Sequence, residues 1–146
     1  MRPDSRLSRM LHALLHMEAA GGPMTSESLA RMLATNPVVV RRTMAGLRKQ
    51  GLVTSEKGHG GGWVLARRLE EVTLLDIYAA LGDPRLFAIG LSADRPDCLV
   101  EQAVNAAVGD TLAEAEALVR QRFAQVTLRD LSRDFEDRLR SLRPGR

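Results

Sequence analysis

Apolar residues recur at helical spacing along the first third of the chain. The first such stretch ends at Gly21-Gly22-Pro23 and contains Leu7, Met10, Leu11, Leu14, Leu15 and Ala19. Intervals of three and four residues predict an amphipathic helix over residues 7–20. A second helix is predicted after Thr25 or Ser26, because either hydroxyl can cap its first turn. Its apolar side consists of Leu29, Ala30, Met32 and Leu33.

A third helix is predicted to begin at Asn36-Pro37 and to end near Gln50, before Gly51. Asparagine caps a helix with its side chain, and proline suits the first helical position because its missing N–H has no partner there. Glycine is the residue that most often follows the last turn. The second and third helices are joined only by residues 34–37, which predicts a helix-turn-helix.

The periodicity changes after Gly51 from helical to extended. Residues 52–55 and 63–66 read as two short strands, and the segment between them contains four glycines, with Lys57 and His59 near its tip. Such a segment is typical of a tight hairpin. A hairpin directly after a helix-turn-helix predicts a winged helix.

The remaining chain is predicted to be helical apart from an irregular segment over residues 85–96. Thr73 caps a helix over residues 74–81, a long helix follows over about 98–123, and Thr127 caps a last helix that ends near residue 142. The apolar residues of the long helix cover more than one narrow face. We therefore expect it to pair with its copy in a second subunit, the alternative being a helix packed wholly on its own domain.

The predicted fold class is mainly α: a winged helix-turn-helix with a two-stranded wing and a long C-terminal dimerisation helix. The expected domains are residues 1–82, which form the winged helix, and residues 83–146, which hold the linker, the dimerisation helix and the closing helix.

Composition narrows the class of protein. Apolar residues make up 45% of the chain and charged residues 27%, the balance of a globular protein. The longest apolar run, residues 77–81, is too short to cross a membrane. A single cysteine, Cys98, excludes an intrachain disulfide and fits a cytoplasmic location.

Charge is distributed unevenly. Residues 1–70 hold 11 Lys and Arg against 5 Asp and Glu, whereas residues 71–146 hold 10 against 13. A basic half indicates contact with a polyanion, although solvated surface charge would give the same count.

The third helix is the candidate recognition helix. Val40, Thr43, Met44 and Leu47 share the face expected to pack on the core. The candidate DNA-binding residues are Asn36, Val38, Val39, Arg41 and Arg42 at its N-terminal end, Arg48 and Lys49 farther along, and Lys57 and His59 on the wing. Arginine can donate to guanine O6 and N7, and valine can contact a thymine methyl group. Lys and Arg farther from the bases suit phosphates.

Several motifs together resemble the Rrf-two (Rrf2) family of dimeric winged-helix regulators. They are residues 36–42 (NPVVVRR), 47–53 (LRKQGLV), 58–67 (GHGGGWVLAR), 72–77 (VTLLDI), 97–100 (DCLV) and 126–131 (VTLRDL). The resemblance spans nearly the whole chain, and the wing motif is its most specific part. It implies base readout by Val38, Arg41 and Arg42, with Lys57 reaching the minor groove. The Arg41 position differs from that of the iron–sulfur cluster regulator, so that regulator's operator is not carried over.

The chain departs from the cluster-bearing members of that family. Those members use three cysteines before the long helix, whereas this chain has only Cys98. We therefore expect no cofactor and no metal. His12 and His16, four residues apart on the first helix, are an alternative metal pair, but one packed and one solvated histidine is the commoner arrangement.

The predicted function is a DNA-binding transcriptional repressor that acts as a homodimer on a palindromic operator in double-stranded DNA. Cys98 is a candidate sensor of oxidants or electrophiles, the alternative being a small buried apolar residue. A winged helix that binds proteins and not DNA is the alternative function. An enzyme is not expected: His59-Gly60-Gly61-Gly62 matches the oxyanion loop of some esterases, but the Gly-x-Ser-x-Gly elbow is absent.

Overall fold

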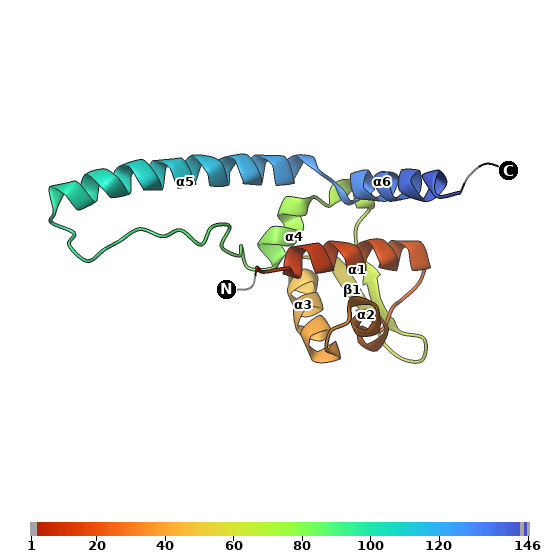
Figure 1. Ribbon diagram of the computed structural model, residues 1–146. Helices are drawn as coiled ribbons and strands as arrows, with labels where there is room; N and C mark the ends of the chain where they lie inside the picture. Colours follow the sequence, from red (N-terminus) through yellow and green to blue (C-terminus); the bar gives the residue numbers. More distant parts are fainter. Residues whose placement is uncertain (1–2, 144, 146) are drawn as a thin grey trace. The chain divides into compact units, whose positions relative to one another are not determined.

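The computed structural model describes residues 3–143 and residue 145 (Figure 1). In chain order the elements are α1 (Arg6–Ala20), α2 (Ser26–Leu33), α3 (Pro37–Lys49), β1 (Val53–Glu56), β2 (Gly62–Leu65), the short 3-10 helix η1 (Leu69–Glu71), α4 (Leu74–Ala80), α5 (Leu99–Gln125) and α6 (Leu128–Ser141). The predicted fold class, a mainly helical winged helix-turn-helix with a two-stranded wing, is confirmed. Both strands lie one residue away from their expected bounds.

The predicted caps explain where the helices begin. Thr25 accepts a hydrogen bond from the backbone N–H of Ser28, and Asn36 accepts one from that of Val38. The turn between α2 and α3 passes through Ala34, whose φ of 52° lies in the left-handed region. Gly51, directly after α3 and its C-cap residue, has a φ of 72° and lets the chain turn into β1.

The wing is an antiparallel pair in which Val53 lies opposite Leu65 and Glu56 opposite Gly62. A short backbone bridge joins it to the segment before α2. Trp63 N–H donates to Met24 O at 2.8 Å, and Met24 N–H donates to Trp63 O at 3.1 Å. The base of the wing is thereby fixed to the segment that enters the helix-turn-helix.

One apolar core holds these elements together. Its fully buried members include Leu14 of α1, Leu29 of α2, Met44 and Leu47 of α3, and Ile77 of α4. Leu128, the first residue of α6, is fully buried in the same core although it follows α4 by almost fifty residues. The core of the winged helix therefore includes a residue from the end of the chain.

The starts of α4 and α6 are built alike and lie side by side. Thr73 with Asp76, and Thr127 with Asp130, each form a capping box in which both side chains accept backbone N–H groups. The two threonines pair as an antiparallel bridge, with Leu74 N–H donating to Val126 O and Leu128 N–H donating to Val72 O, both at 2.9 Å. This bridge anchors α6 to the winged helix.

The chain packs as two compact units. One contains the residues up to 84 together with those from 124 onward, and the other contains residues 85–123. The expected domain division at residue 82 lies close to the first boundary, whereas packing groups α6 with the winged helix.

The second unit consists of an irregular segment followed by most of α5. Asn105 donates to Ser92 O at 2.7 Å, and Gln102 donates to Pro96 O at 2.9 Å, so that the segment runs back along the start of the helix. No residue of α5 is buried. Within the described residues, no helix is both long enough and apolar enough to cross a membrane.

Candidate nucleic-acid interface

The exposed side of α3 carries most of the candidate residues. Val40, Met44 and Leu47 are buried as predicted, and Thr43 is half-buried, its hydroxyl donating to Val39 O at 2.9 Å. The candidates Val38, Val39, Arg41, Arg42, Arg48 and Lys49 are all exposed. The helix therefore presents a basic surface that starts at its N-terminal turn.

Asn36 has a structural role at the start of that surface. Its Oδ1 accepts the backbone N–H of Val38 at 2.8 Å, and the residue itself is exposed. A side chain that caps the helix fixes the direction in which the first turn points. Val38, one turn before Arg41 and Arg42, lies beside them on the same end of the helix.

Arg41 and Arg42 differ in their surroundings. Arg41 Nη1 donates to Glu27 Oε1 of α2 at 3.0 Å, and both side chains remain more than half exposed. Hydrogen bonds from its own backbone N–H and from Arg41 lower the pKa of Glu27. Arg42 has no ion pair within the described part of the chain. No sequence pattern predicts the contact of Glu27, since a partner fourteen residues away on another helix leaves no periodic signal.

Arg48, in the last turn of α3, lies beside Trp63 of the wing. Its guanidinium carbon is 5.9 Å from the centroid of the Trp63 ring, within the range of a cation–π contact. The same indole donates its Nε1 hydrogen to Ser26 Oγ at 2.9 Å. Trp63 therefore joins α3, α2 and β2 at one point.

Lys57 and His59 lie on the exposed tip between β1 and β2, as predicted. The two glycines before Trp63 are required by close backbone approaches. A Cβ at Gly61 would lie 2.2 Å from Glu56 O, and one at Gly62 would lie 2.6 Å from Met24 C and O. The turn and its junction with Met24 thus explain the glycine tract, in agreement with its interpretation as a wing turn.

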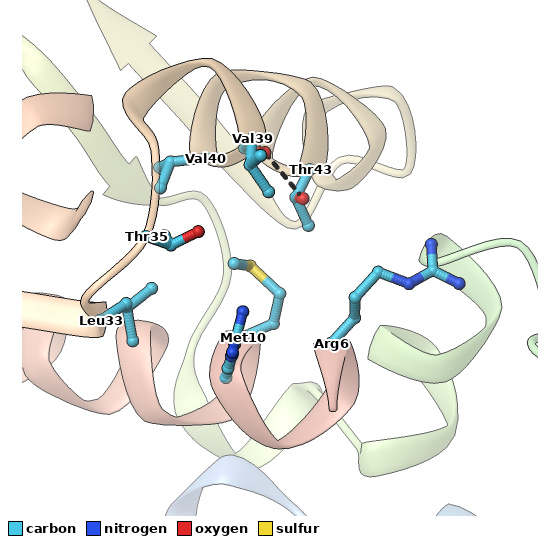
Figure 2. Close-up of a pocket in the computed structure, with 8 residues that line it drawn as sticks. Arg6, Met10, Leu33, Thr35, Val39, Val40 and Thr43 are labelled. Carbon is cyan, nitrogen blue, oxygen red and sulfur yellow. Dashed lines mark hydrogen bonds between the residues drawn. The ribbon is translucent and has the colours of Figure 1, made fainter. Parts of the chain in front are cut away.

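A small cleft adjoins the N-terminal half of α3. Figure 2 shows Val39, Val40 and Thr43 facing Met10 and Arg6 of α1, with Leu33 and Thr35 closing one side. Arg6 is held by Asp4, whose carboxylate it contacts at 2.8 Å, and it also donates to Leu81 O. Arg9 lines the cleft as well and is exposed, so it adds a cation beside α3 that is not among the candidates predicted from the sequence.

Cys98 lies in the second unit, immediately before α5. It is partly exposed in the single chain. Its backbone N–H donates to Arg95 O, and its carbonyl accepts from Gln102 N–H, both at 3.0 Å.

Potential metal ligands are scattered. His12 and His16 are both exposed, and their ring centroids are 4.8 Å apart. The expectation that one of the two is packed and the other solvated is therefore wrong. Across the described residues, no three His, Cys, Asp or Glu side chains gather as a metal-binding group.

Comparison with known proteins places this interface in context. Residues 4–134 match the family Rrf2, described as "Iron-dependent Transcriptional regulator". The protein YwnA of Bacillus subtilis (strain 168), whose name describes an HTH-type transcriptional regulator, is 30% identical over 129 residues, which cover 88% of this chain and 95% of YwnA.

Several solved structures share the fold of this chain. A protein from Lactobacillus plantarum, described as a transcriptional regulator, superimposes with a TM-score of 0.75 at 25% identity over 90% of each chain. IscR of T. potens gives 0.66 at 22% identity, covering 94% of this chain and 90% of IscR. CymR of B. subtilis, described as the global cysteine regulator, gives 0.63 at 24% identity, covering 90% and 97%.

Proposed function

Because this chain belongs to the Rrf2 family of transcriptional regulators, and is therefore not an enzyme, we propose that it represses transcription as a homodimer bound to a palindromic operator in double-stranded DNA. The observation that carries the proposal is the exposed basic surface of α3. Val38, Arg41 and Arg42 occupy its N-terminal end, which is the part of a recognition helix that enters the major groove.

Within this proposal the candidate residues divide by role. Arg41 and Arg42 read guanine edges, while Val38 offers apolar contact to thymine methyl groups. Arg48 and Lys49 bind phosphates, and Lys57 and His59 bring the wing to the backbone or the minor groove. Asn36 supports the interface by capping α3.

The homodimer is inferred from the surface of α5. This helix has 27 residues and no buried side chain, and Leu99, Val100, Val104 and Leu118 are all more than half exposed. Apolar side chains on a long helix gain free energy when a second copy covers them. Two recognition helices related by a twofold axis would bind half-sites one helical turn apart, about 34 Å.

A genomic footprint followed by a salt series tests the proposal. Binding through several phosphates should weaken at least roughly tenfold between about 50 and 200 mM salt, with a twofold-symmetric footprint. A reporter behind the footprinted site should be more active when the gene is deleted. Absence of salt-dependent DNA binding would favour the alternative of a protein-interaction module, and sedimentation as a monomer at micromolar concentration would exclude the dimer.

The iron in the family's description does not fit the residues of this chain. An iron–sulfur cluster needs several thiolate ligands, and the sequence contains one cysteine. The donor atoms of the described residues form no group that could replace them. The proposed mechanism of DNA binding therefore contains no step that depends on iron.

The proposal extends to Cys98 as the sensor of the inducing signal. A partly exposed thiol next to the start of α5 is accessible to peroxide or to electrophiles. Operator binding measured before and after peroxide, quinone or a nitric-oxide donor tests this role. A loss of binding in the wild type that Cys98→Ser escapes supports the sensor, and equal behaviour of the two proteins assigns Cys98 no regulatory role.

A further inference from the structure

The contact between Glu27 and Arg41 crosses the helix-turn-helix at its exposed side. Glu27 lies in the first turn of α2, and Arg41 lies in the second turn of α3. One carboxylate oxygen, Oε1, accepts from one guanidinium nitrogen, Nη1, at 3.0 Å. Arg42, the next residue of α3, forms no such pair within the described residues. The contact thus distinguishes two adjacent arginines on the same surface.

Glu27 is fixed independently of its partner. Thr25 caps the turn that carries it, accepting the N–H of Ser28 at 3.1 Å. The preceding residue, Ser26, is buried and bonded to the indole of Trp63. A carboxylate in the first turn of a helix is also stabilised by the positive end of the helix dipole. The backbone of Glu27 is therefore held by α2 and by the wing, and not by the contact with Arg41.

The contact with Glu27 uses only one nitrogen of the Arg41 guanidinium. A guanidinium carries five N–H donors in a rigid plane, and guanine recognition needs two of them in parallel. Glu27 accepts from Nη1, and Nη2 and Nε form no hydrogen bond within the described residues. An arginine held by one hydrogen bond has already lost rotamer freedom before it meets DNA. Less side-chain entropy is therefore lost when it binds.

We propose that Glu27 is a positioning residue for Arg41, which orients the guanidinium toward a guanine and so contributes to sequence specificity. The inference rests on the proposed function. Its consequence differs from that of a phosphate-binding residue, since Glu27 is negatively charged and close to the proposed DNA surface. Its charge repels every DNA sequence equally, whereas its contact with Arg41 favours only the sequence that Arg41 reads.

The experiment compares dissociation constants for the footprinted operator and for operators altered at each guanine, one position at a time. The proteins are the wild type, Glu27→Gln, Glu27→Ala, Arg41→Ala and the double variant Glu27→Ala/Arg41→Ala. Asp134→Ala is the matched control, because it removes the carboxylate of another exposed ion pair, with Arg138 at 2.8 Å on α6. Circular dichroism melts verify that all variants fold.

Removal of the Glu27 carboxylate should lower discrimination at one base position by about two- to fivefold per half-site, the range of an exposed ion pair. Affinity for random DNA should stay equal or rise. Glu27→Gln keeps an oxygen that can accept from Arg41, so it should retain part of the discrimination. In the Arg41→Ala background the substitution of Glu27 should have no effect on discrimination, and Asp134→Ala should behave as the wild type.

Two results would overturn this inference and leave the proposed function intact. One is normal operator binding by the wild type with discrimination unchanged in Glu27→Ala. The other is tighter operator binding by Glu27→Ala with better discrimination, which would make Glu27 a competitor that Arg41 must leave to reach DNA. If the wild type shows no salt-dependent DNA binding, the proposed function fails and the inference fails with it.

Discussion

The indole Nε1 of Trp63 donates a 2.9 Å hydrogen bond to the hydroxyl oxygen of Ser26. This contact joins β2 to the first turn of α2 across 37 residues of sequence. Ser26 is 7% exposed and is the polar residue buried within the apolar core of the described chain. This hydroxyl group therefore holds the wing to α2 in addition to the Met24 bridge and the contacts of the core.

Ser26→Ala should destabilise the fold by about 1–2 kcal/mol, because the buried N–H of Trp63 is left without its acceptor. Urea denaturation at fixed protein concentration measures the change. Ser28→Ala is the control, since its hydroxyl hydrogen bond with Thr25 is exposed. Equal losses in the two variants would mean that the Trp63 contact contributes nothing beyond an ordinary surface hydrogen bond.

Gly62→Ala should destabilise the wing by about 1–3 kcal/mol, because the new Cβ would overlap the backbone of Met24. The midpoint of thermal unfolding and the affinity for DNA should both fall. Gly22→Ala offers a comparison without this overlap, since a Cβ there meets nothing within 4 Å. A Gly62→Ala protein as stable as Gly22→Ala would show that the approach of Met24 to the wing is not close.

Ala34→Gly should stabilise the protein by up to about 1 kcal/mol. Ala34 has a φ of 52°, and the left-handed region costs a residue with a Cβ about 1–2 kcal/mol, which outweighs the greater flexibility of glycine in the unfolded chain. The midpoint of thermal unfolding should rise by a few degrees. A fall in the midpoint would indicate that the turn does not adopt this conformation in solution.

Arg41→Ala and Arg42→Ala should each cost about 1–3 kcal/mol of operator binding per half-site and relax specificity at one base position. Lys57→Ala should weaken binding to all sequences more evenly, since a wing lysine near the backbone carries little sequence information. Fluorescence anisotropy with operator and random duplexes separates the two patterns. Unchanged operator affinity in all three variants would mean that the recognition surface lies elsewhere.

Protein purified under anaerobic conditions should contain no iron–sulfur cluster, because one cysteine per chain supplies too few thiolate ligands. Iron and sulfide assays together with the visible absorption spectrum provide the measurement. Stoichiometric iron and sulfide, with a charge-transfer band, would contradict the prediction and reveal ligands from another source.

Local signals in the sequence were enough to predict most of the elements. Thr25, Asn36, Thr73 and Thr127 each cap the helix that was expected to follow them, because a cap is a contact between near neighbours. The predicted bounds of both strands differ from the observed ones by one residue. The ends of short strands are set by the pairing of β1 with β2 and not by composition alone.

Contacts between distant residues were not predicted. The Glu27–Arg41 pair, the Ser26–Trp63 bond and the cleft that includes Arg9 join separate elements, and no spacing rule connects their partners. The pairing of Thr73 with Thr127 did leave a signal, because residues 72–76 read VTLLD and residues 126–130 read VTLRD. The repeat reflects two identical capping boxes that lie side by side.

The burial of Leu128 has a consequence for the order of events during synthesis. When residues up to 84 have been synthesised, every helix and strand that packs in the winged helix exists except α6. At about 5–20 residues per second, the roughly 44 further residues to Leu128 take about 2–9 s. During that interval the nascent chain exposes the apolar site on the core that Leu128 later fills. The core of the winged helix is thus completed only after residue 128 has left the ribosome.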